Sequence, residues 1–181
     1  MRSTEGPFNV GVQLVEPFLG LCTVVGLSQE RILGQEQWYY QLRPAQGRST
    51  LKIPANQMSS RGIRPVMQRH EIDSALCNLP DGLSCDAEES HGQRMLRWVA
   101  NLRSGDQRAT PETLRELKVR QALGHTLSGK ESELMTTLCQ TLRQEIALAF
   151  NTTASRAGAR LNQAITWKAT PERKTGASKK Q

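Results

Sequence analysis

The 181-residue sequence lacks a long hydrophobic run, because no apolar stretch approaches the roughly 20 residues that cross a bilayer. Residues 1–8 also lack the apolar stretch of a secretion signal. Hydrophobic residues make up only 37% of the chain, aromatic residues only 4%, and the mean hydropathy is −0.52. We therefore expect a soluble protein with modest cores and exclude the membrane and secreted classes.

Sequence patterns of metal binding and of catalysis are also absent. The four cysteines show no C-x-x-C spacing and no neighbouring histidine pair, so no zinc site is expected. Cys22, Cys77 and Cys139 lie among apolar residues and are interpreted as small core residues in a reducing cytoplasm. The chain has no Gly-rich phosphate loop, nucleophile elbow or H-E-x-x-H motif. We therefore predict no catalytic residue, metal ion or cofactor.

The formal net charge of +7 favours an anionic partner such as a nucleic acid. Lysine and arginine outnumber acids by 8 to 4 in residues 1–70 and by 5 to 1 in residues 166–181. Residues 71–165 hold 11 basic and 12 acidic residues, but half of those acids precede residue 90. A basic front third, an acidic junction, a basic helical part and a basic tail therefore follow one another.

The first third of the chain has the pattern of short β-strands, with runs rich in Val, Ile, Leu, Tyr and Trp. We expect strands over residues 10–15, 21–27, 37–42 and 50–53. Turn-forming residues separate them, because Gly accepts a positive φ angle and Pro fixes its own. Four or five strands this short favour a small barrel, since closing a sheet removes its unpaired edges.

After residue 70 the hydrophobic period becomes that of α-helices. One apolar face, formed by Ile72, Ala75, Leu76 and Leu79, predicts a first helix that ends at residues 80–82. A second helix is expected over residues 89–103. The prediction is therefore an α+β protein with the strands first.

Capping residues mark the starts of the later helices. A third helix should begin with Thr110 as its N-cap and Pro111 at its first position. Ser128 and Glu131 form a capping box that starts a fourth helix, and a fifth begins near Thr153. Residues 167–181 have little to bury, so we expect a basic, disordered tail.

Several short motifs, taken in order, resemble one known family. In the front third they are Phe8-x-Val10-Gly11, Pro17-x2-Gly20, Ile32-x-Gly34-x4-Tyr39, Ile53-Pro54-Ala55 and Gly62-Ile63-Arg64. In the helical part they are Leu102-x-Ser104-Gly105-Asp106, Leu127-Ser128-x2-Glu131 and Leu142-x2-Glu145-x-Ala147. Their order and spacing over residues 8–165 resemble the CarD/CdnL bacterial transcription regulators.

The resemblance implies a small Tudor-like or SH3-like β-barrel over residues 8–67, followed by an all-α helical domain over residues 70–166. Family members bind the β subunit of bacterial RNA polymerase through the barrel, which is also similar to a module of the transcription-repair coupling factor. Their helical domain touches promoter DNA at the upstream edge of the bubble, and together these contacts stabilise the open complex. We therefore expect a monomeric, non-enzymatic bacterial regulator in the cytoplasm, associated with the nucleoid.

For the polymerase contact, the resemblance points to the strand around Ile32 and to a basic residue at the position of Lys52. We include Arg31 and Pro54 in the same predicted site. Some family members carry a basic residue where this chain has Glu30. Arg31 could substitute from the next position, although strand alternation would point it to the other face of the sheet.

For the DNA contact, family members carry a tryptophan that wedges into the minor groove, and this chain has His91 there. An imidazole is smaller and more polar than an indole, so we expect weaker support of the bubble. Arg94 matches a basic family position, and Arg97 offers a further phosphate contact. Gln93 and Leu96 occupy positions where family members often have Arg or Lys.

Three alternatives stay open. Trp98, two helical turns after the histidine, is either a displaced wedge or, beside Val99 and Leu102, a core residue. The protein is either a DNA-contacting regulator or a polymerase-bound adaptor whose helical domain binds another protein, which the missing wedge would favour. A hydrolase or transferase that uses His70 as base and Asp73 as its orienting acid is the most distant reading.

Overall fold

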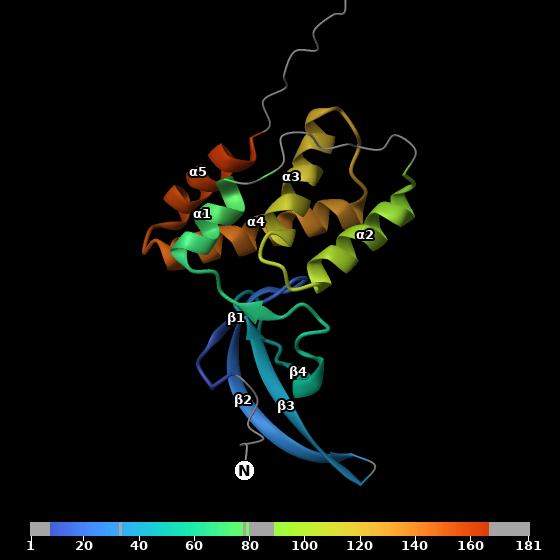
Figure 1. The fold of residues 1–181 in the computed structure, drawn as a ribbon, viewed down its shortest axis with the longest axis vertical. Helices are drawn as coiled ribbons and strands as arrows, with labels where there is room; N and C mark the ends of the chain where they lie inside the picture. Colours follow the sequence, from blue (N-terminus) through green and yellow to red (C-terminus); the bar gives the residue numbers. More distant parts are fainter. Residues whose placement is uncertain (1–7, 33, 78, 80–88, 167–181) are drawn as a thin grey trace, which may run out of the picture.

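The computed structural model describes residues 8–32, 34–77, 79 and 89–166. Within these residues, a five-stranded antiparallel sheet is followed by five α-helices. The strands form one end of the molecule and the helices the other (Figure 1). This arrangement confirms the predicted α+β class, with a barrel-like domain ahead of a helical one. The predicted tail, residues 167–181, lies outside the described residues. None of the described helices is long and apolar enough to cross a membrane.

The front domain is one antiparallel sheet in the order β4-β3-β2-β1-β5. Its strands are β1 (Gln13–Glu16), β2 (Gly20–Ile32), β3 (Gln35–Pro44), β4 (Leu51–Pro54) and β5 (Arg64–Pro65), and the 3-10 helix η1 (Ala55–Gln57) follows β4. Its core consists of buried side chains from the strands and the η1 region: Leu14, Cys22, Val24, Tyr40, Leu42, Ile53, Met58 and Ile63.

The hairpin of β2 and β3 is longer than the sequence predicts. Pairing continues beyond the core, from Ser28 opposite Tyr39 to Ile32 opposite Gln35, and Gly34 in the turn has a φ of 82°. These outer residues are mostly polar, so hydrophobic patterning did not mark them; main-chain hydrogen bonds between the strands hold them together. In Figure 1 the two strands curve away from the helices as an arm.

The three cysteines among the described residues occupy different environments. Cys22 is buried in the sheet core, where burial and the charge of Glu16 raise the pKa of its thiol to about 11. Cys139 is half-buried against the helical core. Cys77 is exposed at the end of the first helix, so its prediction as a core residue is wrong. That helix turns its other apolar residues inward and position 77 outward.

The helical domain is built around its longest helix. Its helices are α1 (Arg69–Cys77), α2 (His91–Arg103), α3 (Ala109–Ala122), α4 (Gly129–Ala149) and α5 (Ala154–Ile165). Helix α4 packs against α1, α3, α5 and β2. Leu134, Leu138, Leu142 and Ile146 repeat along its buried face at helical spacing. One helix therefore contacts three of the other four helices and also reaches the sheet.

The predicted helix starts are confirmed at two of three positions. The Ser128 hydroxyl accepts from the Glu131 N–H at 3.2 Å, and the Glu131 carboxylate accepts from the Ser128 N–H at 2.8 Å, which completes the capping box. Thr153 caps α5. Thr110 is not a cap, because α3 begins at Ala109. The Asp106 carboxylate accepts the Arg108 N–H at 2.8 Å instead, and this bond lowers the pKa of Asp106.

A buried ion pair between β5 and α4 joins the two domains. Arg64 and Glu145 are 7% and 0% exposed, and two nitrogens of the guanidinium lie 2.7 and 3.0 Å from the two carboxylate oxygens. The Met67 main-chain N–H donates to the same carboxylate at 3.0 Å. A two-pronged arginine–carboxylate pair fixes orientation as well as distance. The sheet and the helices therefore meet in a defined geometry.

Gly62 lets the main chains of the two domains approach closely at this joint. Its φ of +73° is in the left-handed region, and a Cβ placed on it would lie 2.8 Å from the Arg103 Cα and clash with the Leu102 carbonyl oxygen. Only glycine avoids both the strain and the clash. This explains why a glycine is required just before β5.

Candidate functional site

Lys52 lies on β4, at the end of the sheet order, where one strand edge has no partner among the described strands. Its side chain is 41% exposed. The ammonium group forms an ion pair with the Glu30 carboxylate and lies 5.4 Å from the centre of the Tyr39 ring. The predicted polymerase-binding cation is therefore accessible, but it is already paired with a carboxylate of the same sheet.

The strand register explains this contact. Glu30 is opposite Gln37 on β3, and Lys52 is opposite Gln41, so both residues fall on the sheet face that carries Tyr39. Arg31 is opposite Glu36 and falls on the other face. The residue that departs from the family pattern at position 30 is thus the partner of Lys52, which spacing along the sequence could not show.

The other two predicted polymerase-binding residues end their strands. Pro54 is the last residue of β4 and is half-buried opposite Tyr39. Ile32 is the last residue of β2, opposite Gln35, near the turn of the hairpin arm. Lys52 and Pro54 therefore lie together on the edge strand, whereas Arg31 and Ile32 lie together at the hairpin end.

His91 is the first residue of α2 and presents an accessible imidazole. Its side chain is 49% exposed, and its Nδ1 lies 3.3 Å from a Glu131 carboxylate oxygen. Ser90 ahead of it caps the helix, since its hydroxyl accepts from the Gln93 N–H and the Gln93 side chain accepts from the Ser90 N–H. The capping box fixes the start of α2 and with it the position of His91.

Arg94 is held inside the domain. It is 7% exposed, and two of its guanidinium nitrogens lie 3.3 Å from a Glu131 oxygen, while a third donates to the Glu89 carbonyl at 3.1 Å. Burial raises the pKa of Glu131, but hydrogen bonds from Ser128 and Arg94 outweigh burial and lower it. The side chain of Arg94 thus compensates a buried carboxylate at the start of α4.

Arg97 bridges two carboxylates. Its guanidinium donates to Glu89 at 2.9 Å through two nitrogens and to Glu116 at 2.6 and 2.9 Å. These bonds, first those to Glu89, raise the pKa of Arg97, and the bond from Arg97 lowers the pKa of Glu89. The side chain is still 48% exposed, so it can face a second partner while paired.

Trp98 is a core residue. It is 1% exposed, and its indole N–H donates to Glu116 at 2.9 Å. The guanidinium carbons of Arg94 and Arg97 lie 5.7 and 6.0 Å from its ring centre. An indole enclosed in this way cannot insert between base pairs unless the domain opens. Of the two interpretations of Trp98, the structure supports the core one.

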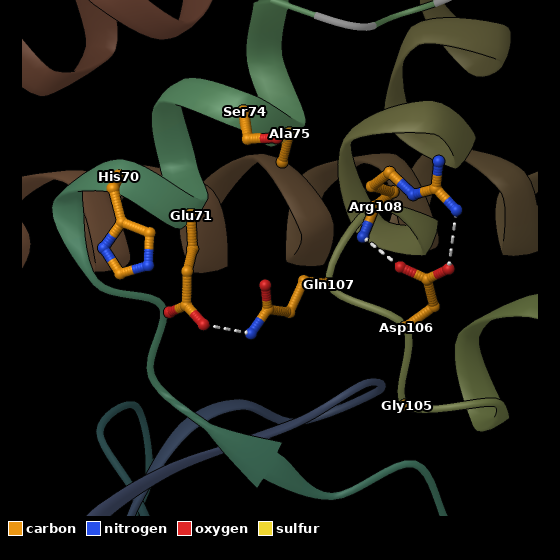
Figure 2. Close-up of a pocket in the computed structure, with 8 residues that line it drawn as sticks. All are labelled: His70, Glu71, Ser74, Ala75, Gly105, Asp106, Gln107 and Arg108. Carbon is orange, nitrogen blue, oxygen red and sulfur yellow. Dashed lines mark hydrogen bonds and ion pairs between the residues drawn. The ribbon is translucent and has the colours of Figure 1, made fainter.

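A polar hollow of about 480 Å³ lies between the start of α1 and the α2–α3 turn. Figure 2 shows His70, Glu71, Gln107 and Arg108 around it. The Glu71 carboxylate accepts from the Gln68 N–H and from Gln107, and these bonds lower its pKa. Asp73, which the enzyme reading assigns to His70, forms an ion pair with Arg160 instead. The hollow thus shows no base oriented by an acid among its described residues.

Clusters suited to a metal ion are also absent from the described part of the chain, where no group of three or more His, Cys, Asp or Glu side chains converges.

Comparison with known families identifies the front domain. The family model described as CarD-like/TRCF RID domain matches residues 8–67, the front third of the chain. The matched segment contains the whole described sheet, including the edge strand with Lys52 and the hairpin arm. This domain family is a non-enzymatic one. The front domain, residues 8–67, is therefore a CarD-like/TRCF RID domain, and this match supports an RNA polymerase-interacting protein related to transcription.

Proposed function

We propose that the front domain binds the β subunit of bacterial RNA polymerase through the edge strand β4 and the end of the β2–β3 hairpin. The family match over residues 8–67 is the observation that carries this proposal. An unpaired strand edge can extend a partner's sheet by main-chain hydrogen bonds, while exposed side chains select the partner. Lys52 and Pro54 would supply that selection at the edge, and Arg31 would supply it at the hairpin end, where Ile32 ends β2.

The Lys52→Glu variant tests the polymerase contact. It removes the accessible cation and places a second carboxylate beside Glu30, so we expect the affinity for the isolated β-subunit lobe to fall at least about tenfold. Biolayer interferometry at two salt concentrations measures this. Both side chains are exposed, so folding should be retained.

The swapped variant, Lys52→Glu with Glu30→Lys, is the matched control. It rebuilds the ion pair with reversed polarity and keeps the net charge. If the partner needs a cation at position 52, the swapped variant should bind the β-subunit lobe as weakly as Lys52→Glu. If the ion pair only stiffens the sheet, the swapped variant should bind with the wild-type affinity. Unchanged binding by Lys52→Glu alone would remove the main support for this docking surface.

We further propose that the helical domain contacts promoter DNA at the upstream edge of the bubble and so stabilises the open complex. The accessible His91 at the start of α2 would face the bubble edge, where an imidazole can stack on a base or donate to a minor-groove acceptor. Arg97 would face phosphate with its exposed side, and Arg94 would support both by holding α2 against α4. In this role the protein would act as a monomer on the bacterial nucleoid.

The His91→Trp variant tests the DNA contact. An indole offers a broader apolar plane to an unstacked base step, so we expect a several-fold longer open-complex lifetime on a ribosomal-type promoter. Filter-binding decay after competitor challenge measures the lifetime. His125→Trp is the matched control, because His125 is an exposed histidine on the α3–α4 turn. Equal lifetimes for the two variants would show that position 91 does not face the bubble.

A polymerase-bound adaptor remains the second candidate function. It is favoured by one observation: near the start of α2 the two arginines are paired with acids, while Leu96 beside them is 73% exposed. Such a face suits a protein partner at least as well as phosphates. Footprinting of the upstream bubble edge, with and without the protein on polymerase, separates the two, because an adaptor leaves the DNA pattern unchanged.

A further inference from the structure

A second basic surface lies on the side of the helical domain formed by α1, α4 and α5. Phe150, at the C-terminal end of α4, is contacted by arginines from two other helices. The guanidinium carbon of Arg69 lies 4.9 Å from the ring centre, and that of Arg160 lies 4.1 Å from it. Arg156 precedes Arg160 by one helical turn on α5 and is exposed. We call these four residues the Phe150 patch.

The charges of the Phe150 patch are accessible. Arg69, Arg156 and Arg160 are all exposed. Arg160 forms an ion pair with Asp73, in which both side chains are more than two-fifths exposed. Among the described residues, Asp73 is the one carboxylate within ion-pair distance of these three arginines. The patch thus presents three guanidinium groups against one carboxylate.

Around α2, in contrast, carboxylates outnumber the arginines that they pair with. Arg94 and Arg97 there face three carboxylates, those of Glu89, Glu116 and Glu131. An anionic polymer that follows the field of the protein is therefore drawn to the Phe150 patch more strongly than to α2.

The net charge is also unevenly distributed along the sequence. From residue 146 to residue 181 the sequence holds seven Lys and Arg and one acid, Glu172. Residues 1–145 hold 17 basic and 16 acidic residues. Nearly all of the net charge of +7 therefore belongs to α5 and the sequence that follows it.

We propose that the Phe150 patch binds phosphates of duplex DNA, as a contact separate from the one at the start of α2. This inference rests on the proposed DNA-binding function and extends it. Guanidinium groups match phosphate oxygens in a two-pronged geometry. Phe150 is half-buried and covered by Arg69 and Arg160, so the patch offers no open apolar pocket to anchor a peptide. These features favour a phosphate backbone over an acidic protein.

The test compares two variants of the full chain that remove the same charge. Arg156→Gln with Arg160→Gln alters the patch, whereas Arg43→Gln with Arg48→Gln alters exposed arginines of the sheet domain. Fluorescence anisotropy measures binding to a linear duplex and to a fork-junction DNA over a range of salt. For the patch variant we expect about tenfold weaker duplex binding, and a salt-dependence slope smaller by about 2. The sheet variant should match the wild-type chain.

The outcomes separate this inference from the proposed function. Equal losses in the two variants, or none in either, overturn the Phe150 patch as a specific site while DNA binding itself stands. If the wild-type chain binds neither DNA, the proposed DNA contact fails and the patch fails with it. A patch variant that binds DNA normally but loses binding to polyglutamate would also overturn the inference, since it assigns the patch to an acidic protein.

Folding of the patch variant is checked by urea unfolding. Its ion pair with Asp73 is exposed, and exposed pairs contribute little to stability. A patch variant that unfolds at the wild-type urea concentration therefore gives an interpretable binding result. If the patch variant unfolds at a lower urea concentration, the single variant Arg156→Gln replaces it, because this variant keeps Arg160 and its contacts. Its salt-dependence slope should differ from that of the wild-type chain by about half as much as expected for the double variant.

Discussion

Glu145→Ala is expected to lower the free energy of unfolding by about 3–5 kcal/mol, because it leaves the buried Arg64 guanidinium without its carboxylate. The same change also removes the acceptor of the Met67 main-chain N–H. For a chain of this size, the melting temperature should fall by roughly 10 °C. Urea unfolding followed by circular dichroism measures the loss.

Two further variants establish the cause. Glu145→Gln keeps the size and one acceptor, so we expect it to fall between the wild-type chain and Glu145→Ala. Arg64→Leu with Glu145→Leu removes both charges, and such double replacements are often neutral, so it should be more stable than Glu145→Ala. If all three variants unfold at the wild-type urea concentration, the pair does not hold the domains together.

Trp98→Ala is expected to lower the free energy of unfolding by about 3–5 kcal/mol, since it leaves a large cavity in the helical core. It also removes the donor to Glu116, a carboxylate that Arg97 shares. Urea unfolding measures the loss. The size of the effect separates a core tryptophan from one that serves a surface contact.

Leu96→Ala is the control for this prediction. Leu96 lies two residues earlier on the same helix and is 73% exposed, so its truncation should change stability by no more than about 0.5 kcal/mol. Trp98→Phe keeps most of the volume and loses the indole N–H, so an intermediate effect is expected. A Trp98→Ala variant as stable as Leu96→Ala would contradict the placement of Trp98 in the core.

Features set by neighbours in the sequence were predictable. The capping box of Ser128 and Glu131 spans four residues, so its two hydrogen bonds follow from local geometry alone. The apolar spacing of Ile72, Ala75 and Leu76 likewise identified the buried face of α1. The hairpin arm was underestimated because its outer residues are polar and are held by pairing between strands, which the hydrophobic pattern does not register.

Features set by distant partners were not predictable from residue type. Arg94 and Arg97 match the kind of residue that contacts phosphate, but their carboxylates lie up to 37 positions away. In the same way, the partner of Lys52 is 22 positions away, on a strand that is not its immediate neighbour. The sequence pattern identified which residues carry charge, and only the fold shows which of those charges remain accessible.

The Arg64–Glu145 joint also has a consequence for how two weak contacts combine. When two binding surfaces belong to one stiff body, attachment of the first presents the second at a high effective concentration, but only if the body has the right shape. In the proposed function, a polymerase-bound sheet would hold α2 at a fixed height and angle above the DNA. If the joint could bend, the effective concentration of the second surface would fall, although every contact at either surface would remain.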